Sequence, residues 1–296
     1  MTARSWPAQP ARRRHRLHLV RAVAFAILLP SLALPAAAQG LKLQGIGKEL
    51  RTCSRPDEGP PDARIGSCTA IIESNVATRR GLAVAYNNRG NAHNAKSDYD
   101  RAIKDYNEAI ETDPTYANAF NNRGVLHQKL GEHKRAIEDF DRSIKLAPIS
   151  GPVFANRAES YVKLGDQRRA LQDYAAAIKL KPNLGGAWNG RCWARAISGD
   201  LRAALADCNE SLRLEPNAAA TLDSRGLTYL KLGQLPAALA DYNSALQINP
   251  QLANSLYGRG IVKRRSGNAA NGDADIAAAT KLAPTIAADF ARYGVK

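Results

Sequence analysis

The stretch YNNRGNAHNAKSDYDRAIKDYNEAI, residues 86–110, decides the fold of this chain. It predicts two helices joined by a turn near Ser97. A second copy, FNNRGVLHQKLGEHKRAIEDFDRSI, begins 34 residues later at Phe120. Self-similarity at a fixed period of this length is typical of repeat architectures, in which each unit stacks on its neighbours. The sequence therefore predicts an array of helical hairpins.

The period continues from about Ala83 to Pro284, which gives six units. The middle of each unit holds a turn residue, in most units a glycine, which suits a helix end. A proline then ends the second helix, since it cannot continue the hydrogen-bond ladder. The turn residues are Ser97, Gly131, Gly165, Gly199, Gly233 and Gly267; the prolines are Pro114, Pro148, Pro182, Pro216, Pro250 and Pro284; small residues recur at Ala102, Ala136, Ala170, Ala204, Ala238 and Gly272; bulky residues recur at Tyr106, Phe140, Tyr174, Tyr242 and Ile276, with Cys208 in the fourth unit.

These columns resemble the tetratricopeptide repeat family, clearly over residues 83–284 and more faintly over about 50–82. The resemblance implies an all-α fold, a right-handed superhelical solenoid of stacked antiparallel helix hairpins whose first helices line the concave face. Residues 285–296 carry Ile286, Phe290 and Tyr293 at helical spacing, which predicts a C-terminal capping helix that closes the last unit. Residues 39–82 form an N-terminal segment with a degenerate hairpin.

An arginine recurs in every first helix and an aspartate in every second helix, whereas many family members carry leucine in the arginine column. Arg89 lies eight residues before Ser97 and Asp105 eight residues after it, so the two face each other across the hairpin. A charge near a core is tolerated when it is paired, and arginine can bond a carboxylate twice. We expect a structural pair in each unit, with an arginine ladder for an anionic ligand as the alternative. The pairs are Arg89 with Asp105, Arg123 with Asp139, Arg157 with Asp173, Arg191 with Asp207, Arg225 with Asp241 and Arg259 with Asp275.

The four cysteines form two local pairs, Cys53 with Cys68 and Cys192 with Cys208. The second pair lies at nearly mirrored positions around the turn at Gly199. An even count in such pairs favours disulfides in an exported protein. A redox pair or a zinc site is the weaker alternative, because the chain has no C-x-x-C motif and no histidine near these cysteines.

Residues 1–38 read as a signal peptide. They hold six arginines and no acid, then an apolar run of about 14 residues, too short for the roughly 20 that span a bilayer. Small residues before Gln39 suit cleavage near Ala38, with an uncleaved anchor as the alternative. We therefore expect a periplasmic or secreted protein without a membrane span in the mature chain. The formal charge is +15, of which the signal peptide carries six, and export removes most nucleic-acid partners.

No catalytic motif is present: the sequence lacks G-x-S-x-G, H-E-x-x-H, a phosphate loop and a dinucleotide fingerprint. After residue 38 the histidines are His93, His127 and His133. The first two share a column with Tyr161 and Tyr229, which favours packing over metal binding. We therefore expect no enzyme activity, no cofactor and no metal.

The resemblance implies that a partner binds at the outward positions of the first helices. Asparagine suits the backbone of an extended peptide because its side chain donates and accepts. Tryptophan is enriched at binding hot spots, so Trp193 is either an anchor or a packing residue. Asp223 also falls at an outward position. The predicted groove residues are Asn87, Asn91, Asn121, Gln128, Lys129, Lys163, Asn189, Trp193 and Lys231.

Some family members hold the C-terminal carboxylates of chaperone tails in a clamp of Lys, Asn and Arg. Asn91 and Asn122 match two clamp positions, but Asn87, Pro152 and Asn156 replace the basic residues. We therefore do not predict binding of such C-terminal tails. The resemblance implies a non-catalytic scaffold or adaptor of the cell envelope that binds a protein or an extended peptide segment. The alternatives are a thiol-redox helper using Cys192 and Cys208, and a carrier for an anionic envelope polymer.

Overall fold

The computed structural model describes residues 47–55 and 59–295, and the regular structure in these residues is helical. The signal peptide predicted for residues 1–38 lies outside them. Residues 47–54 are helical and precede the labelled helices. These are α2 (Pro61–Glu73), α3 (Arg79–Ala95), α4 (Tyr99–Thr112), α5 (Ala117–Lys129), α6 (His133–Leu146), α7 (Gly151–Lys163), α8 (Gln167–Leu180), α9 (Gly185–Ser198), α10 (Leu201–Leu214), α11 (Ala219–Lys231), α12 (Leu235–Ile248), α13 (Ala253–Arg265), α14 (Ala269–Leu282) and α15 (Ile286–Arg292).

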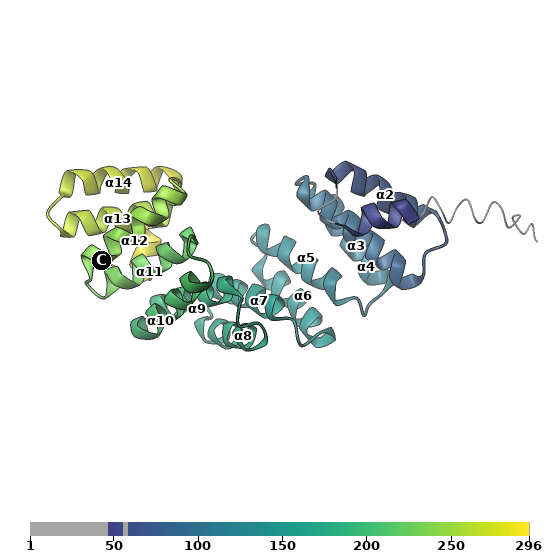
Figure 1. The fold of residues 1–296 in the computed structure, drawn as a ribbon, viewed down its shortest axis with the longest axis horizontal. Helices are drawn as coiled ribbons and strands as arrows, with labels where there is room; N and C mark the ends of the chain where they lie inside the picture. The colour runs from purple at the N-terminus through teal and green to yellow at the C-terminus, as the bar shows by residue number, and fades with distance from the viewer. Residues whose placement is uncertain (1–46, 56–58, 296) are drawn as a thin grey trace, which may run out of the picture. The chain divides into compact units, whose positions relative to one another are not determined.

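Hairpins of consecutive helices follow one another from α3 and α4 to α13 and α14 (Figure 1). Each second helix also contacts the first helix of the next hairpin, and first helices of adjacent hairpins contact each other. The five turn glycines have φ between +74° and +92°, and Ser97 has φ +60°. This left-handed conformation ends each first helix where the column predicts it. The fold is the predicted all-α solenoid of stacked hairpins.

The first hairpin of the array begins earlier than the period predicts. Helix α3 starts at Arg79 and not near Ala83, because the Thr78 hydroxyl caps it by accepting a hydrogen bond from the Gly81 N–H at 3.1 Å. Before it, the helical residues 47–54 and α2 are joined by the disulfide between Cys53 and Cys68. The described part of the predicted N-terminal segment is therefore helical and crosslinked by its cysteine pair, and the degenerate hairpin remains a prediction.

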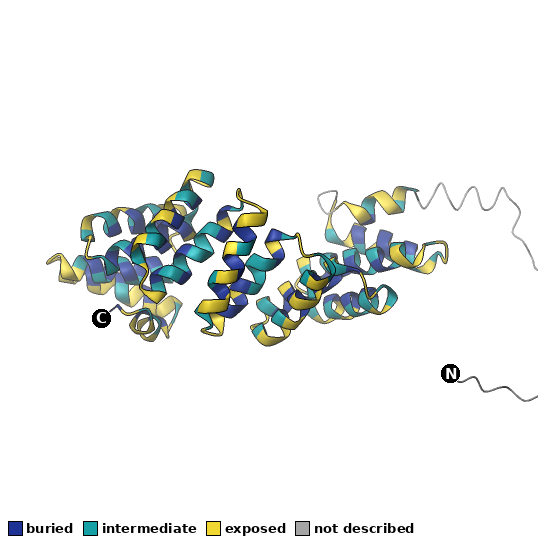
Figure 2. Ribbon diagram, turned by 90° about the horizontal axis from the view of Figure 1, so that it is seen from below, coloured by how far each residue is buried: buried dark blue, intermediate teal, exposed yellow. Residues whose placement is uncertain are grey.

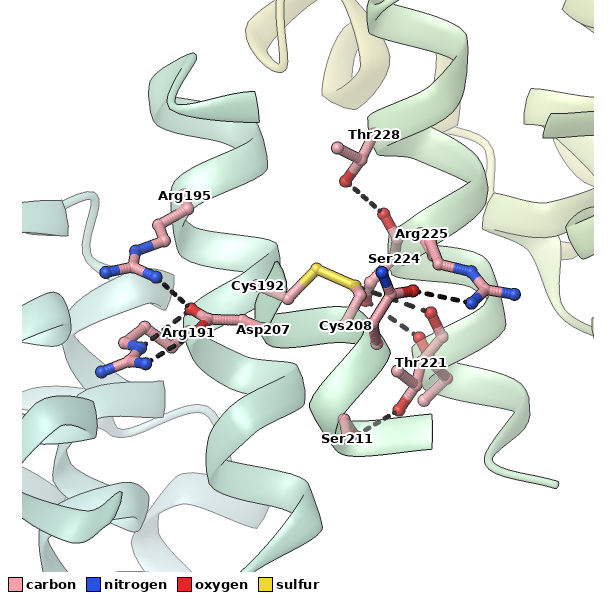
Figure 3. The surroundings of a disulfide bond; sticks show 12 residues. Arg191, Cys192, Arg195, Asp207, Cys208, Ser211, Thr221, Ser224, Arg225 and Thr228 are labelled. Carbon is pink, nitrogen blue, oxygen red and sulfur yellow. Dashed lines mark hydrogen bonds and ion pairs between the residues drawn. A yellow bond between two sulfur atoms is a disulfide. The ribbon is translucent and has the colours of Figure 1, made fainter. Parts of the chain in front are cut away.

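A glycine packs against an aromatic ring in the core of three hairpins, those that contain Gly90, Gly124 and Gly226. A Cβ placed on Gly90 would lie 2.8 Å from the Tyr106 ring, and one on Gly124 would lie 2.8 Å from the Phe140 ring. At these two positions a side chain would collide with the ring at the present helix separation. In the fourth hairpin the same two columns hold Cys192 and Cys208, and their disulfide occupies the place of the glycine–aromatic contact (Figure 3).

The C-terminal helix does more than close the last unit. Ile286 and Phe290 are buried against α13 and α14, as a capping helix requires. Tyr293, just after the helix, reaches past α13 to the Trp193 ring in α9, with centroids 5.1 Å apart.

Buried residues line the contacts between helices in Figure 2. Among the described residues, no helix has the length and apolarity needed to cross a bilayer.

Candidate functional site

The Arg–Asp column forms an ion pair in every hairpin. The arginine Nε and Nη2 groups donate to the two carboxylate oxygens at 2.6–2.9 Å. The aspartate side chains are 3–11% exposed and those of the arginines 15–23%. Two-point bonding of a nearly buried carboxylate is the geometry that makes such a charge tolerable.

Most of these arginines also hold the preceding hairpin. Their Nη1 groups donate to residues of the second helix before them, or of α2 in the first case: Thr69, Asn107, Asp141, Asn209 and Asn243. In the fourth hairpin, Arg195 adds a bond to Asp207 at 2.6 Å (Figure 3). Burial lowers the pKa of Arg157, but hydrogen bonds with Asp173 and Asp141 outweigh it and raise that pKa. Most N–H donors of these arginines are bonded within the chain, so few remain to bind an anionic ligand.

The histidine column contacts the same aspartates. His93 Nε2 lies 3.9 Å from Asp105, and His127 Nε2 lies 3.8 Å from Asp139. Burial lowers the pKa of His93. In the described residues no group of three or more His, Cys, Asp or Glu side chains could hold a metal ion.

Both predicted cysteine pairs are joined as disulfides. Cys68, Cys192 and Cys208 are fully buried, and Cys53 is nearly so. A thiolate that attacks a disulfide must reach one of its sulfurs. The Cys192–Cys208 bond is therefore shielded by the fourth hairpin itself.

The first half of the predicted groove differs from the expectation. Asn87 is only 3% exposed, and its Oδ1 accepts a hydrogen bond from Asn122 at 2.9 Å. Asn87 is therefore a link between adjacent first helices, and its prediction as an exposed groove residue is wrong. The other side chains of this half also make contacts within the chain: Asn91 accepts from Tyr106, Asn121 accepts from Asn156, Gln128 donates to the Asn156 carbonyl, and Lys129 lies over the Tyr99 ring.

The second half forms a pocket of about 840 Å³ on the face of the first helices. Helices α7, α9, α11 and α13 line it, and the C-terminal segment adds one wall. Three predicted groove residues are in it, Lys163, Asn189 and Trp193. Lys231 lies beside it and donates to the Ala196 carbonyl at 2.6 Å, so its ammonium ties α11 to α9.

The C-terminal wall is aromatic and charged. Tyr293 packs edge-on against Trp193 and lies 5.8 Å from the Phe290 ring, which in turn packs on Tyr257. Asp289 and Arg292 also line the pocket and form an ion pair with each other. Trp193 is therefore both a packing residue and part of the pocket surface.

Asp223 contributes a buried carboxylate to this pocket. It is 7% exposed and accepts a hydrogen bond from the Ser255 hydroxyl at 2.6 Å. Burial raises the pKa of Asp223 to about 6, against the lowering by the hydrogen bonds of Ser255 and Asn254. On the neighbouring helix α9, the buried Asn189 Oδ1 accepts no hydrogen bond from the described residues. The sequence places Asp223 among the outward positions of the first helices. No sequence pattern predicts that Tyr293 lines the same pocket.

Family models match the array at four places. A model described as TPR repeat matches residues 90–131 and 226–267, and two described as tetratricopeptide repeat match 117–149 and 152–184. The chain is a tetratricopeptide repeat protein. No curated protein matches its sequence.

Solved structures show the same fold as this tetratricopeptide repeat protein. A tetratricopeptide repeat protein from Parabacteroides merdae is 18% identical, with a TM-score of 0.65 over 85% of this chain and 99% of that one. PilW, described as a widely conserved type IV pilus biogenesis factor, is 19% identical, with a TM-score of 0.61 over 69% and 94%. YrrB, described as a TPR protein with an unusual peptide-binding site, is 24% identical, with a TM-score of 0.52 over 65% and 97%. At these identities the similarity is one of fold.

Proposed function

We propose that this protein is a non-catalytic scaffold that binds a segment of a partner protein in the pocket of α7, α9, α11 and α13. The observation that carries the proposal is the pocket itself: about 840 Å³ on the face that four successive first helices share. Binding sites are typically concave and combine apolar surface with a few placed polar groups, as Trp193, Asn189 and Asp223 do here. YrrB, which has a similar fold, is described as having a peptide-binding site.

We place this function outside the cytoplasm. The proposed signal peptide of residues 1–38 supports export, and two disulfides are typical of an oxidising compartment. The partner is then a protein of the cell envelope or a secreted one.

The two alternative functions have less support. A thiol-redox role requires an accessible sulfur, whereas Cys192 and Cys208 are fully buried. An anionic-polymer carrier requires free cationic side chains, whereas the arginine ladder is bonded to aspartates and the pocket itself contains Asp223.

A pocket-filling variant tests the proposal without removing any contact. Gly186 lines the pocket on α9 and a Cβ there meets nothing within 4 Å, so Gly186→Phe should fold and obstruct the pocket. Gly66→Phe is the matched control, since a Cβ at Gly66 in α2 also meets nothing within 4 Å and Gly66 lies outside the pocket.

The measurement is native affinity capture from an envelope extract with the wild type and both variants. We expect at least one partner to be retained by the wild type and Gly66→Phe and lost with Gly186→Phe. Retention of all partners by Gly186→Phe would place binding elsewhere on the array. Capture of nothing by the wild type would count against a scaffold.

A further inference from the structure

Asp223 has no cationic partner in the described residues, and this is unusual for so buried an acid. Its hydrogen-bond donors are neutral, the Ser255 hydroxyl and the Asn254 side chain. The six ladder aspartates of the same chain, with comparable burial, each bond an arginine. A buried carboxylate is costly unless a positive charge or several donors compensate it. Asp223 is therefore a charge that the fold leaves uncompensated.

The other charged side chains that line the pocket are two acids and two bases, so their formal charges cancel. Arg292 forms an ion pair with Asp289 on the C-terminal wall. Lys163 and Glu159, which carry opposite charges, lie one helical turn apart on α7. The remaining charge in the cavity is the negative one of Asp223. The Asp223 carboxylate would repel an anionic ligand, whereas a cationic ligand would form an ion pair with it.

Asn189 points to the same chemistry independently. Its Oδ1 is buried and accepts no hydrogen bond from the part of the chain that the structure describes, although it lines the same pocket on the helix next to Asp223. In the first half of the array the equivalent column behaves differently, since Asn87 and Asn121 accept from Asn122 and Asn156 of the next first helix. At Asn189 the position corresponding to those donors is Ser224, whose hydroxyl donates to the Ala220 carbonyl instead. An acceptor is thus left for a ligand that donates.

Aromatic rings complete the surroundings. Trp193 and Tyr293 line the pocket and pack edge to face, with ring centroids 5.1 Å apart. Ammonium and guanidinium groups are attracted to such rings. An acid, an orphaned acceptor and two aromatic side chains around one cavity form a site for a cation on a flexible stem.

We propose that the pocket binds a lysine or arginine side chain of the partner segment, with Asp223 and Asn189 as its acceptors and Trp193 and Tyr293 beside it. This inference rests on the proposed function and names the chemistry that the partner must present. Arginine fits the two acceptors best, because its planar fork carries several N–H donors.

Peptide pools test this assignment. Nonapeptides with random flanks are prepared with arginine, citrulline or glutamate fixed at the centre; citrulline keeps the shape of arginine and removes its charge. Retention is measured on immobilised wild type, Asp223→Asn, Gly186→Phe and Asp62→Asn. Asp223→Asn keeps an oxygen that can accept from Ser255, and Asp62→Asn is an isosteric control at a site 73% exposed on α2.

We expect the wild type and Asp62→Asn to retain the arginine pool at least about ten-fold more than the citrulline and glutamate pools. Asp223→Asn should reduce that preference to within about two-fold while a thermal melt shows a folded array. If Gly186→Phe blocks retention but the pools do not differ, or Asp223→Asn keeps the preference, the cationic site is refuted and the scaffold stands. If retention is unaffected by Gly186→Phe, the proposed function itself fails.

Discussion

Arg157 joins three helices through one guanidinium group. Two of its nitrogens donate to Asp173 in α8, and the third donates to Asp141 in α6. Arg157→Leu would leave Asp173, 9% exposed, as a buried charge without its partner. Removing one member of a buried pair costs about 3–5 kcal/mol, so we expect a loss of about 3 kcal/mol in the free energy of unfolding measured by urea denaturation.

The control for this variant is Arg169→Leu, which removes an exposed ion pair with Asp166. It should leave the unfolding midpoint unchanged, because exposed pairs contribute little. Combining Arg157→Leu with Asp173→Leu should recover part of the loss. If the two single variants unfold alike, the ladder contributes no more to stability than a surface pair.

Asp223 should make the stability of the protein fall as the pH rises towards neutrality. Its pKa is raised to about 6 in the folded protein, so the folded state holds the proton that the unfolded state releases near 3.8. Stability at this site is therefore present below the unfolded pKa and is lost as the pH rises through about 6. The two titratable neighbours on which its charge acts, Tyr242 and Tyr293, have raised pKa values and stay neutral in this window.

Asp223→Asn should consequently stabilise the ligand-free protein. A shift of about two pKa units corresponds to about 3 kcal/mol at pH 7.5, and the advantage should shrink by about 2 kcal/mol at pH 4.5. Urea denaturation of variant and wild type at both pH values measures it. An advantage that does not change with pH would mean that the carboxylate is not desolvated. An acid that weakens the fold at neutral pH is consistent with a group retained for binding.

At the scale of one hairpin, a disulfide and a glycine–aromatic contact are interchangeable solutions. Cys192 and Cys208 occupy the columns that hold Gly226 and Tyr242 in the next hairpin, where a Cβ on the glycine would lie 2.9 Å from the ring. Cys192→Gly with Cys208→Tyr should therefore fold and melt close to the oxidised wild type. Cys192→Ser alone loses the crosslink and creates no packing, so we expect a loss of about 3 kcal/mol.

Thermal melts of protein refolded from denaturant with and without a reductant separate the two contributions, because the buried disulfide is reached by the reductant in the unfolded chain. The remaining disulfide, between Cys53 and Cys68, is common to both proteins. The reductant should therefore lower the melting temperature of the wild type more than that of the double variant. Equal shifts in the two proteins would mean that the fourth hairpin gains nothing from its disulfide.

The sequence predicts what repeats within a hairpin, and less of what lies between hairpins. The columns of Gly199, Arg191 and Asp207 identify the turn and the ion pair because mirrored positions in a hairpin must meet. Asn87 shows the limit: its column predicts an outward position, but its burial depends on Asn122 in the next first helix. The repeat period predicts on which face of a helix a residue lies. Whether that residue is exposed depends on the side chains of the adjacent helix.

The path of the C-terminal segment is the other part that could not be predicted. The spacing of Ile286, Phe290 and Tyr293 predicts a short helix, and α15 is present. Its direction depends on which rings it meets, and Tyr257 and Trp193 belong to two different hairpins. No periodic signal encodes such a contact, because the segment after Pro284 occurs once. For the same reason the sequence does not predict the pocket, which the C-terminal segment helps to enclose.

At the scale of the whole array, the C-terminal segment couples hairpins that a solenoid would leave independent. In repeat proteins each unit contacts its neighbours, so a local change is felt locally. The contact between Tyr293 and Trp193 links α9 directly to the segment that is packed on α13. Tyr293→Ala should therefore increase amide hydrogen exchange in α9 as well as in α13, and leave α5 unchanged.

Tyr99→Ala provides the matched loss of a tyrosine from the first hairpin, where the ring lies under Lys129. Its effect on exchange should be confined to α4 and α5, because that contact joins neighbouring hairpins. If Tyr293→Ala affects α13 alone, the segment is a cap and the wall of the pocket is dispensable. If α9 responds, the last ten or so residues set the shape of the binding face over three hairpins, and a ligand that contacts Trp193 must also perturb the C-terminal segment.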